Sequence, residues 1–347
     1  MHEVNPNGSI RLVSIGGGTG LSTLLAGLKR FVGERSEEIW IDSLSAVVTV
    51  SDDGGSSGRL REELQILPPG DIRNCMIALS EDSSLLARLF RYRFGGAGDL
   101  AGHSFGNLFL AALTDVTGDF VEAVRLSSEV LASKGHIFPA TTSDVHLIAE
   151  LEDGREVHGE SQITAARSHI RHLRLVPEDC LPLPETLAAV RTADVITIGP
   201  GSLFTSIIPN LLVRGVAEAI GEASGTKIFI ANLMTQPGET DDYGFCDHLD
   251  TIRSYAPQIR FDYAIVNDRP ISDNQAKIYR ADGASQVLLD QASVERLDPD
   301  LQVARADLLD EGDMVRHSAE RLARVVMSCA TNERAQKLIE TEVIAAK

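Results

Sequence analysis

The feature that most constrains the fold of this chain is an apolar segment near the N-terminus that runs through a glycine turn into a helix. Residues 11–15 form a short β-prone run, and residues 16–20 read GGGTG. The leucines that follow have the i, i+3, i+4, i+7 spacing of one helix face: Leu21, Leu24, Leu25 and Leu28. Glycines let backbone N–H groups approach an anion, and the helix adds its positive end at the same place. The stretch predicts a phosphate-binding turn between a strand and a helix.

This turn matches neither of the two standard phosphate-binding motifs. Gly16 and Gly18 occupy the first and third positions of a dinucleotide fingerprint, but its sixth position is Leu21. No lysine follows the glycines as a Walker loop requires. On this loop alone, a simple tight turn remains an alternative to an anion site.

A second polar, glycine-rich segment follows the next expected strand. Residues 44–50 are β-prone, and residues 51–61 read SDDGGSSGRLR. An acid at the end of the second strand of a doubly wound sheet is placed to accept hydrogen bonds from a ribose, and Asp52 or Asp53 fits that role or that of a magnesium ligand. Other donors for an anion in this segment are Ser56, Ser57 and Arg59. A flexible loop is the alternative.

Polar residues recur after later strands and at one helix start. The strands expected at residues 194–198 and 227–231 are followed by a second glycine turn at 199–202 and by polar residues from 232 onward. Open α/β sheets bind ligands at such strand ends. Two further segments carry polar candidates, namely a helix start with Arg73 and Asn74 and a glycine-rich loop with His103 and Asn107. Capping and solvation explain the first pair equally well, and His103 fits a general base, a ligand donor or a structural histidine.

Composition bounds the class of partner. Among 347 residues, 32 Lys plus Arg face 50 Asp plus Glu, a net charge of −18 that argues against nucleic acid and anionic membranes as partners. The four cysteines have no paired spacing, so neither a zinc site nor a disulfide framework is expected. No apolar run has the length of a signal peptide or a membrane span, and we expect a cytoplasmic protein.

The order of elements predicts one α/β domain over residues 1–332 with a charged tail at 333–347. A small β-rich insertion is expected at 138–182, because residues 145–151 and 155–160 alternate around a Glu-Asp-Gly turn. We expect a last short strand at 287–289 and a closing helix at 314–329.

Six ordered blocks together resemble one family. They are residues 16–22, 51–61, 67–74, 102–107, 199–202 and 234–241. The similarity spans about residues 10–330 and is to the YvcK-type gluconeogenesis factors, which belong with the CofD-type 2-phospho-L-lactate transferases of deazaflavin cofactor synthesis. It implies a Rossmann-like, doubly wound and mostly parallel sheet with helices on both faces.

The resemblance implies two functions of different classes. The first, which we favour, is a cytoplasmic regulator that binds a UDP-sugar, UDP-N-acetylglucosamine in particular, and that is needed for cell shape and envelope growth on gluconeogenic carbon sources. It needs no cofactor but implies a regulatory protein partner, and self-association is plausible. The second is a magnesium-dependent transferase with a guanine nucleotide donor and a deazaflavin acceptor, in which Asp52, Asp53 or Asp241 holds the metal. The sequence does not decide whether a reaction is catalysed.

In the favoured reading, the two glycine turns hold the diphosphate, Asp52 or Asp53 the ribose, and Asn232 with Gln236 the base or the sugar, while the last helix closes over the ligand. No catalytic residue is assigned. The candidate ligand-binding residues are Gly17, Gly18, Thr19, Gly20, Ser22, Asp52, Asp53, Ser56, Ser57, Arg59, Arg73, Asn74, His103, Asn107, Gly199, Gly201, Ser202, Asn232, Thr235, Gln236 and Arg316.

Overall fold

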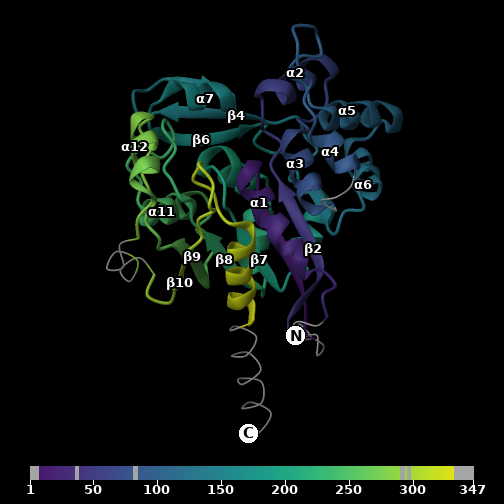
Figure 1. The fold of residues 1–347 in the computed structure, drawn as a ribbon. Coiled ribbons are helices and arrows are strands. Elements are labelled where there is room, and N and C mark those ends of the chain that lie inside the picture. The colour runs from purple at the N-terminus through teal and green to yellow at the C-terminus, as the bar shows by residue number, and fades with distance from the viewer. Residues whose placement is uncertain (1–7, 36–38, 81–84, 290–293, 295–297, 332–347) are drawn as a thin grey trace.

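A seven-stranded parallel sheet forms the centre of the protein in the computed structural model, which describes residues 8–35, 39–80, 85–289, 294 and 298–331 (Figure 1). The strand order is β10-β9-β8-β7-β1-β2-β3. The strands are β1 (Ser9–Gly16), β2 (Trp40–Val48), β3 (His136–Pro139), β7 (Val195–Ile198), β8 (Thr226–Ile230), β9 (Tyr263–Asn267) and β10 (Gln302–Ala306). Every residue of β7 and β8 is buried, as expected for central strands that are covered on both faces.

Helices cover both faces of this sheet, which confirms the predicted doubly wound architecture. Their bounds are α1 (Gly18–Leu28), α2 (Gly55–Leu64), α3 (Gly70–Leu79), α4 (Leu85–Arg91), α5 (Phe105–Thr117), α6 (Phe120–Val130), α8 (Pro184–Thr192), α9 (Ile208–Leu212), α10 (Val216–Glu222), α11 (Phe245–Tyr255) and α12 (Asp273–Ala281). The described residues also form two short helical segments, a 3₁₀ turn η1 (Lys29–Phe31) and a π-helical segment η2 (Leu203–Ile207). The predicted leucine face of α1 is buried in the core.

The closing helix packs directly on α1. A Cβ at Gly27 would lie 2.0 Å from the carbonyl oxygen of Ala319, so the two backbones are in contact (Figure 1). This helix occupies residues 319–331 and begins later than predicted. The reason is that residues 314–318 form a return strap instead, in which the Ser318 N–H donates to Leu308 O and the Asp310 N–H to Arg316 O.

The β-rich insertion is a separate antiparallel sheet of order β5-β4-β6, as the alternating pattern predicts. It contains β4 (His146–Leu151), β5 (Glu156–His158), α7 (Glu160–Ala166) and β6 (Ile170–Val176). The expected insertion starts at residue 138, but residues 138 and 139 still belong to β3 of the main sheet. The small sheet lies beside α2 at one end of the molecule (Figure 1).

The predicted last strand is wrong, and the predicted tail lies outside the described residues. Residues 287–289 do not form a strand; Gln286 makes only an isolated bridge with Met234. The last strand is β10, a half-exposed edge strand whose residues give little apolar signal. The predicted tail at 333–347 lies outside the described residues.

Among the described residues, no single helix has the length and apolar composition needed to cross a membrane. One pair of helical segments, Leu203–Leu212 and Val216–Glu222, passes that test when the two are taken together. They are bent by 81° relative to each other, and most of their residues are buried in the core of this fold.

Candidate functional site

The main cleft lies where the chain reverses its direction of sheet growth. From β1 the chain adds β2 and β3 on one side, then returns to add β7 and β8 on the other. Ligands of open α/β sheets bind beyond the carboxyl ends of the strands at this position. A cleft of about 700 Å³ is found there. Ten of the sequence-predicted site residues line it, namely Gly17, Gly18, Thr19, Gly20, Gly201, Ser202, Asn232, Thr235, Gln236 and Arg316.

The first glycine turn joins β1 to α1 and packs against the second turn. Gly18 has a φ of +62°, which favours glycine over residues with a side chain. A Cβ at Gly20 would lie 2.3 Å from the carbonyl oxygen of Pro200. The missing side chains therefore allow the loops after β1 and β7 to touch. The N–H of Gly18 donates a hydrogen bond to Asp71 Oδ2 at 2.6 Å.

The second glycine turn joins β7 to η2. Gly199 has a φ of +84° and lies outside the cleft lining. The N–H of Gly201 donates to Asn232 Oδ1 at 3.1 Å. The hydroxyl of Ser202 accepts from the N–H of Thr205 at 3.2 Å and bonds to a carboxylate oxygen of Glu239. Both turns therefore have one N–H that bonds to a polar side chain.

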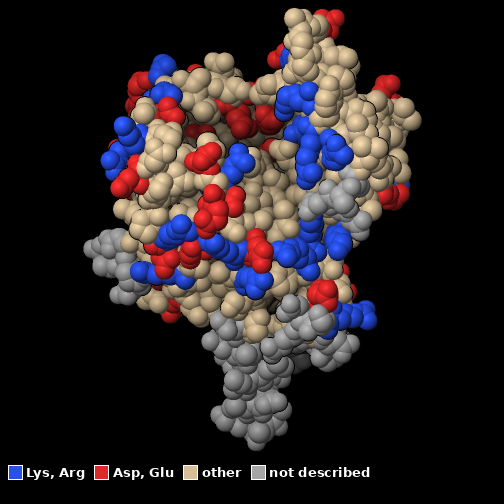
Figure 2. All heavy atoms as spheres, in the orientation of Figure 1, with Lys and Arg blue, Asp and Glu red and all other residues tan. Residues whose placement is uncertain are grey.

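Three carboxyl groups near these turns have raised pKa values. Burial first, and then the charge of Asp52, raise the pKa of Asp71 to about 6. Burial together with the charges of neighbouring carboxylates raises the pKa of Glu160 to about 9. The pKa of Glu239 is also raised by burial, against the opposing effect of hydrogen bonds from Ser202 and Thr164. Figure 2 shows acidic side chains within the hollow between the small sheet and α2, and arginine or lysine on its rim.

None of these three carboxyl groups was among the sequence candidates. Asp71 sits in the first turn of α3, where an acid is typical of helix capping, and Glu160 has no motif around it. Asp71 and Glu239 lie within the blocks 67–74 and 234–241, which are the signal that could have identified them. Glu160 begins α7 of the insertion and Glu239 follows β8, so only tertiary packing brings them to one cleft.

A separate polar cluster contains four of the remaining candidates. Arg73 Nη1 donates to Asn107 Oδ1 at 3.0 Å and to Ser104 Oγ at 2.5 Å. Asn107 Nδ2 donates to Ser56 Oγ at 3.0 Å, and Ser56 Oγ lies 2.9 Å from His103 Nδ1. Burial lowers the pKa of Arg73 and that of His103. These hydrogen bonds connect α2, α3 and α5, so the side chains of this polar cluster also stabilise the packing of the three helices.

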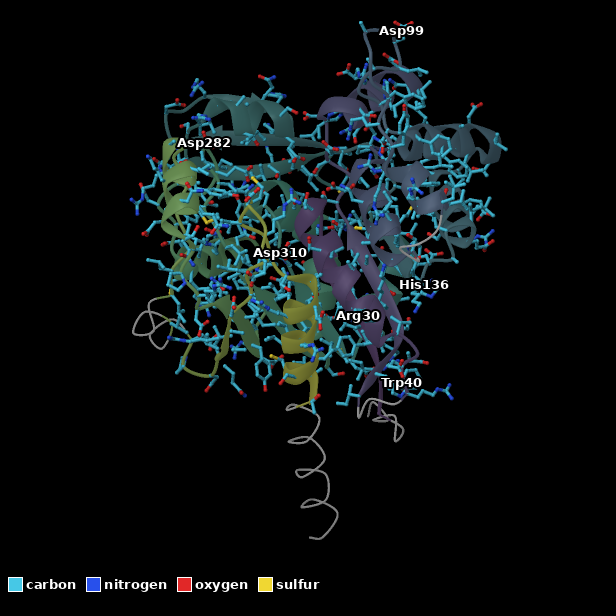
Figure 3. All side chains as sticks on the ribbon, viewed as in Figure 1. Arg30, Trp40, Asp99, His136, Asp282 and Asp310 are labelled. Atoms are coloured by element: carbon cyan, nitrogen blue, oxygen red, sulfur yellow. The ribbon has the colours of Figure 1, made fainter. Side chains whose placement is uncertain are left out.

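The other candidates have local partners. Arg59 Nη2 donates to Ala101 O at 2.7 Å and holds the glycine-rich loop, whose tip at Asp99 points away from the sheet (Figure 3). Asn74 Oδ1 accepts from Arg73 Nη2, and Ser22 Oγ donates to Thr19 O at 3.0 Å. Ser57 is buried beside Gly70.

All three acids considered for magnesium accept hydrogen bonds from backbone N–H groups, and Asp241 Oδ2 accepts from the Gly238 N–H at 2.7 Å. Asp52 Oδ1 accepts from the Gly54 N–H at 2.9 Å, and Asp53 Oδ1 accepts from the Ser161 N–H at 2.8 Å, which anchors the insertion. Within the described ranges, no group of three or more His, Cys, Asp or Glu side chains has the arrangement of a metal site. The charge of Asp52 raises the pKa of Asp71.

The far wall of the cleft comes from α12 and the return strap. Tyr279 of α12 and Asp282, the residue after its last turn, line the cleft, and Figure 3 shows Asp282 at this end of the helix. The hydroxyl of Tyr279 accepts from the Val315 N–H at 3.0 Å, which fixes the strap against α12. Arg316 is exposed on the strap, and the next residue, His317, is buried.

Comparison with known proteins agrees with this fold. The model of the family described as 2-phospho-L-lactate transferase CofD matches residues 12–309. The gluconeogenesis factor of Halalkalibacterium halodurans is 45% identical over 316 residues, covering 91% of this chain and 95% of that protein. The gluconeogenesis factor of Bacillus subtilis is 44% identical over 318 residues, with coverage of 91% and 97%.

A crystal structure shows the same architecture. A Bacillus halodurans protein described as a member of the UPF0052 family superposes with a TM-score of 0.86 at 44% identity, covering 92% of this chain and 99% of that one. The matched family model extends over most of the chain, and the relatives match along nearly their whole length. The chain therefore belongs to the CofD family, which includes proteins named gluconeogenesis factors.

Proposed function

We propose that this protein binds a UDP-sugar, UDP-N-acetylglucosamine in particular, in the cleft between the loops after β1 and β7, and that it acts as a regulator rather than as an enzyme. One observation carries the proposal: two glycine turns, each followed by a helical segment, touch at the switch point of the sheet. Backbone donors at such turns suit a diphosphate. The cleft, at about 700 Å³, also lies within the usual volume of a small-molecule site.

In this proposal the ligand lies along the cleft with its diphosphate at the turns. The base and sugar extend toward Asn232, Gln236 and Arg316, which line the same cleft on the β8 side. Arg316 is exposed and offers a guanidinium for a phosphate or a hydroxyl group. Asp52 and Asp53, which we assigned to the ribose from the sequence, lie outside the cleft lining, and their place in the site remains a prediction.

The carboxyl groups that line the cleft would repel an anionic ligand if they were ionised. With a pKa of about 9, Glu160 is protonated at neutral pH and adds no negative charge. The raised pKa of Glu239 acts in the same direction. The protonated Glu160 carboxyl group can donate a hydrogen bond, so the cleft repels a diphosphate less than its residue types imply.

The proposal is tested by a thermal-shift titration of the purified full chain with UDP-N-acetylglucosamine, UDP-glucose, GDP and GTP, each with and without magnesium. A ligand that binds only the folded state stabilises it by about 2.7 kcal/mol at a hundredfold excess over its Kd. A shift with the UDP-sugar, followed by recovery of that sugar unchanged, supports the regulator. The absence of any shift with UDP-sugars contradicts it.

The second candidate function is a transferase, which the description of the matching family model favours. Magnesium beside Asp52 and Asp71 would neutralise negative charge on a transferred phosphoryl group. Arg59 belongs to α2 and Arg73 to α3, on the same side of the molecule as the polar cluster. Shifts that need magnesium and a guanine nucleotide, together with turnover of a deazaflavin acceptor, would favour this function over the regulator.

We also place the protein in the cytoplasm as part of this proposal, with a regulatory protein partner, self-association and a role in cell shape during growth on gluconeogenic carbon. The name of the relatives, gluconeogenesis factor, supports the carbon-source part. Deletion of the gene, followed by cell imaging on gluconeogenic and glycolytic carbon sources, tests it. Cells of unchanged shape on both sources would contradict the role.

A further inference from the structure

We infer that His317 is a specificity-determining residue of the cleft, whose Nε2 accepts a hydrogen bond from an N–H or O–H group of the bound ligand. This inference rests on the proposed function, because it concerns a ligand in the same cleft. It adds a residue and a chemical requirement that the glycine turns do not supply. A diphosphate meets the turns, whereas His317 requires a donor on the base or the sugar.

The first step is the position of His317. It lines the cleft although only 9% of its surface is exposed, so the side chain forms part of the inner wall. The strap holds its backbone, because residue 317 bridges to Leu309 and the neighbouring Ser318 N–H donates to Leu308 O at 2.7 Å. The backbone of His317 is therefore held in place by the strap.

The second step is the bonding of the ring. Nε2 is buried and has no hydrogen-bond partner among the described residues. Burial lowers the pKa of the ring to about 4, against the smaller raising effect of a hydrogen bond to the backbone of Ala231. The ring is neutral at pH 7. A ring that donates to a carbonyl through Nδ1 leaves Nε2 as a bare acceptor.

A second bare acceptor lies in the same cleft. Oε1 of Gln236 is also buried and has no partner in the described part of the chain. Buried polar atoms in native proteins nearly always have a partner, so two such acceptors in one cleft point to donors that a ligand brings. A uracil N–H, an acetamido N–H and sugar hydroxyls are donors of this kind, and a diphosphate has none to offer at neutral pH.

His248 shows why position matters. Its Nε2 likewise lacks a partner among the described residues, while its Nδ1 lies 2.8 Å from Gly244 O. It is 1% exposed, packs edge-on against the ring of Tyr243 and does not line the cleft. This chain therefore offers a matched buried histidine that carries no expectation of ligand contact.

The test is isothermal titration of the full chain and its variants with UDP-N-acetylglucosamine and, separately, with inorganic pyrophosphate. His317→Phe should weaken the UDP-sugar by about tenfold, the factor that corresponds to one hydrogen bond of about 1.4 kcal/mol. Pyrophosphate affinity should stay nearly unchanged, because that probe binds at the glycine turns and lacks the base and the sugar that carry the donor to Nε2. His317→Gln, which can place an amide oxygen near the same point, should restore part of the loss, and His248→Phe should bind both probes as the wild type does.

Equal UDP-sugar affinity of His317→Phe and wild type overturns the inference while leaving the proposed function intact. Equal loss of both probes also overturns it, because that pattern indicates a structural role. If the wild type binds neither UDP-N-acetylglucosamine nor UDP-glucose, the proposed function falls and this inference falls with it. If the variants fail to fold, ¹⁵N NMR of the unmutated protein decides: the Nε2 signal of His317 must move on addition of UDP-N-acetylglucosamine while that of His248 stays, and an unmoved His317 signal overturns the inference.

Discussion

The backbone N–H of Gly18 donates a hydrogen bond to the carboxylate of Asp71 at 2.6 Å, across 53 residues of sequence. A carboxylate thus accepts a hydrogen bond from a backbone N–H of the same turn in which the sequence predicts a phosphate site. Burial and the charge of Asp52 raise the pKa of this carboxyl group to about 6. An anion that binds at the turn meets a group that titrates near neutral pH, so binding and protonation are linked.

Replacing Asp71 with Asn should stabilise the protein at pH 8. The folded-state pKa of about 6 exceeds the ordinary value of 3.8, so ionisation of Asp71 destabilises the folded protein above pH 6. This destabilisation disappears as the pH falls from about 6 to 3.8. Asn keeps an acceptor for Gly18 without the charge. We expect urea unfolding to show a gain of about 1–3 kcal/mol at pH 8 and a much smaller difference at pH 4.

The exposed Asp115→Asn on α5 is the control for this substitution and should change the stability little at either pH. A loss of stability of Asp71→Asn at pH 8 would mean that the carboxylate contributes more through its bonds to Gly18 and its attraction to Arg73 than its burial costs.

Glu160 should make anion binding weaker at alkaline pH. Its pKa of about 9 lies above the ordinary 4.5, so the group is neutral at pH 7 and gains a negative charge as the pH rises through 9. Repulsion in a partly enclosed cleft then weakens UDP-N-acetylglucosamine by about tenfold between pH 7 and pH 10. Glu160→Gln should bind as the wild type does at pH 7 and lose most of this pH dependence in calorimetry. A variant with the same pH profile as the wild type would count against a role of Glu160.

Gly20→Ala should separate the two glycine turns. The added Cβ would lie 2.3 Å from Pro200 O and 2.7 Å from its carbonyl carbon, which are backbone atoms that cannot move aside cheaply. We expect a loss of about 1–3 kcal/mol of stability, as for other overpacked sites, and a loss of UDP-sugar binding. Gly95→Ala is the matched control, because a Cβ there has no heavy atom within 4 Å. Wild-type stability of Gly20→Ala would show that the turns do not pack as described.

Arg316→Ala should weaken the ligand without weakening the fold. The side chain is exposed and lines the cleft. It belongs to the strap, whose backbone N–H groups donate to the Tyr279 hydroxyl and to Leu308 O. We expect about a tenfold loss of affinity for UDP-N-acetylglucosamine with an unchanged Tm. Arg88→Ala, on the exposed face of α4, is the control and should change neither value. Unchanged affinity of Arg316→Ala would remove this arginine from the site.

The sequence predicted the parts of the site that are encoded by short segments. The strand, glycine turn and helix at the N-terminus, the second turn at 199–202 and the hairpin of the insertion all follow from local periodicity and turn residues. The edge strand β10 was missed, because Gln302–Ala306 is half exposed and carries no apolar alternation. The prediction of a helix over residues 314–318 was wrong, because no residue type or spacing in this segment indicates its pairing with residues 308–310.

By itself, the sequence determined the α/β class and the two glycine turns, because hydrophobic periodicity and the backbone freedom of glycine act over neighbouring positions. The doubly wound sheet and part of the ten predicted residues that line the cleft, Arg316 among them, were implied by the resemblance to a known family. Only the tertiary structure decided that Asp71, Glu160 and His317 join those turns, and that Arg73 and His103 belong to a cluster beside them. Burial, pKa and the partner of each polar atom depend on residues brought together by packing, and spacing along the chain does not contain that information.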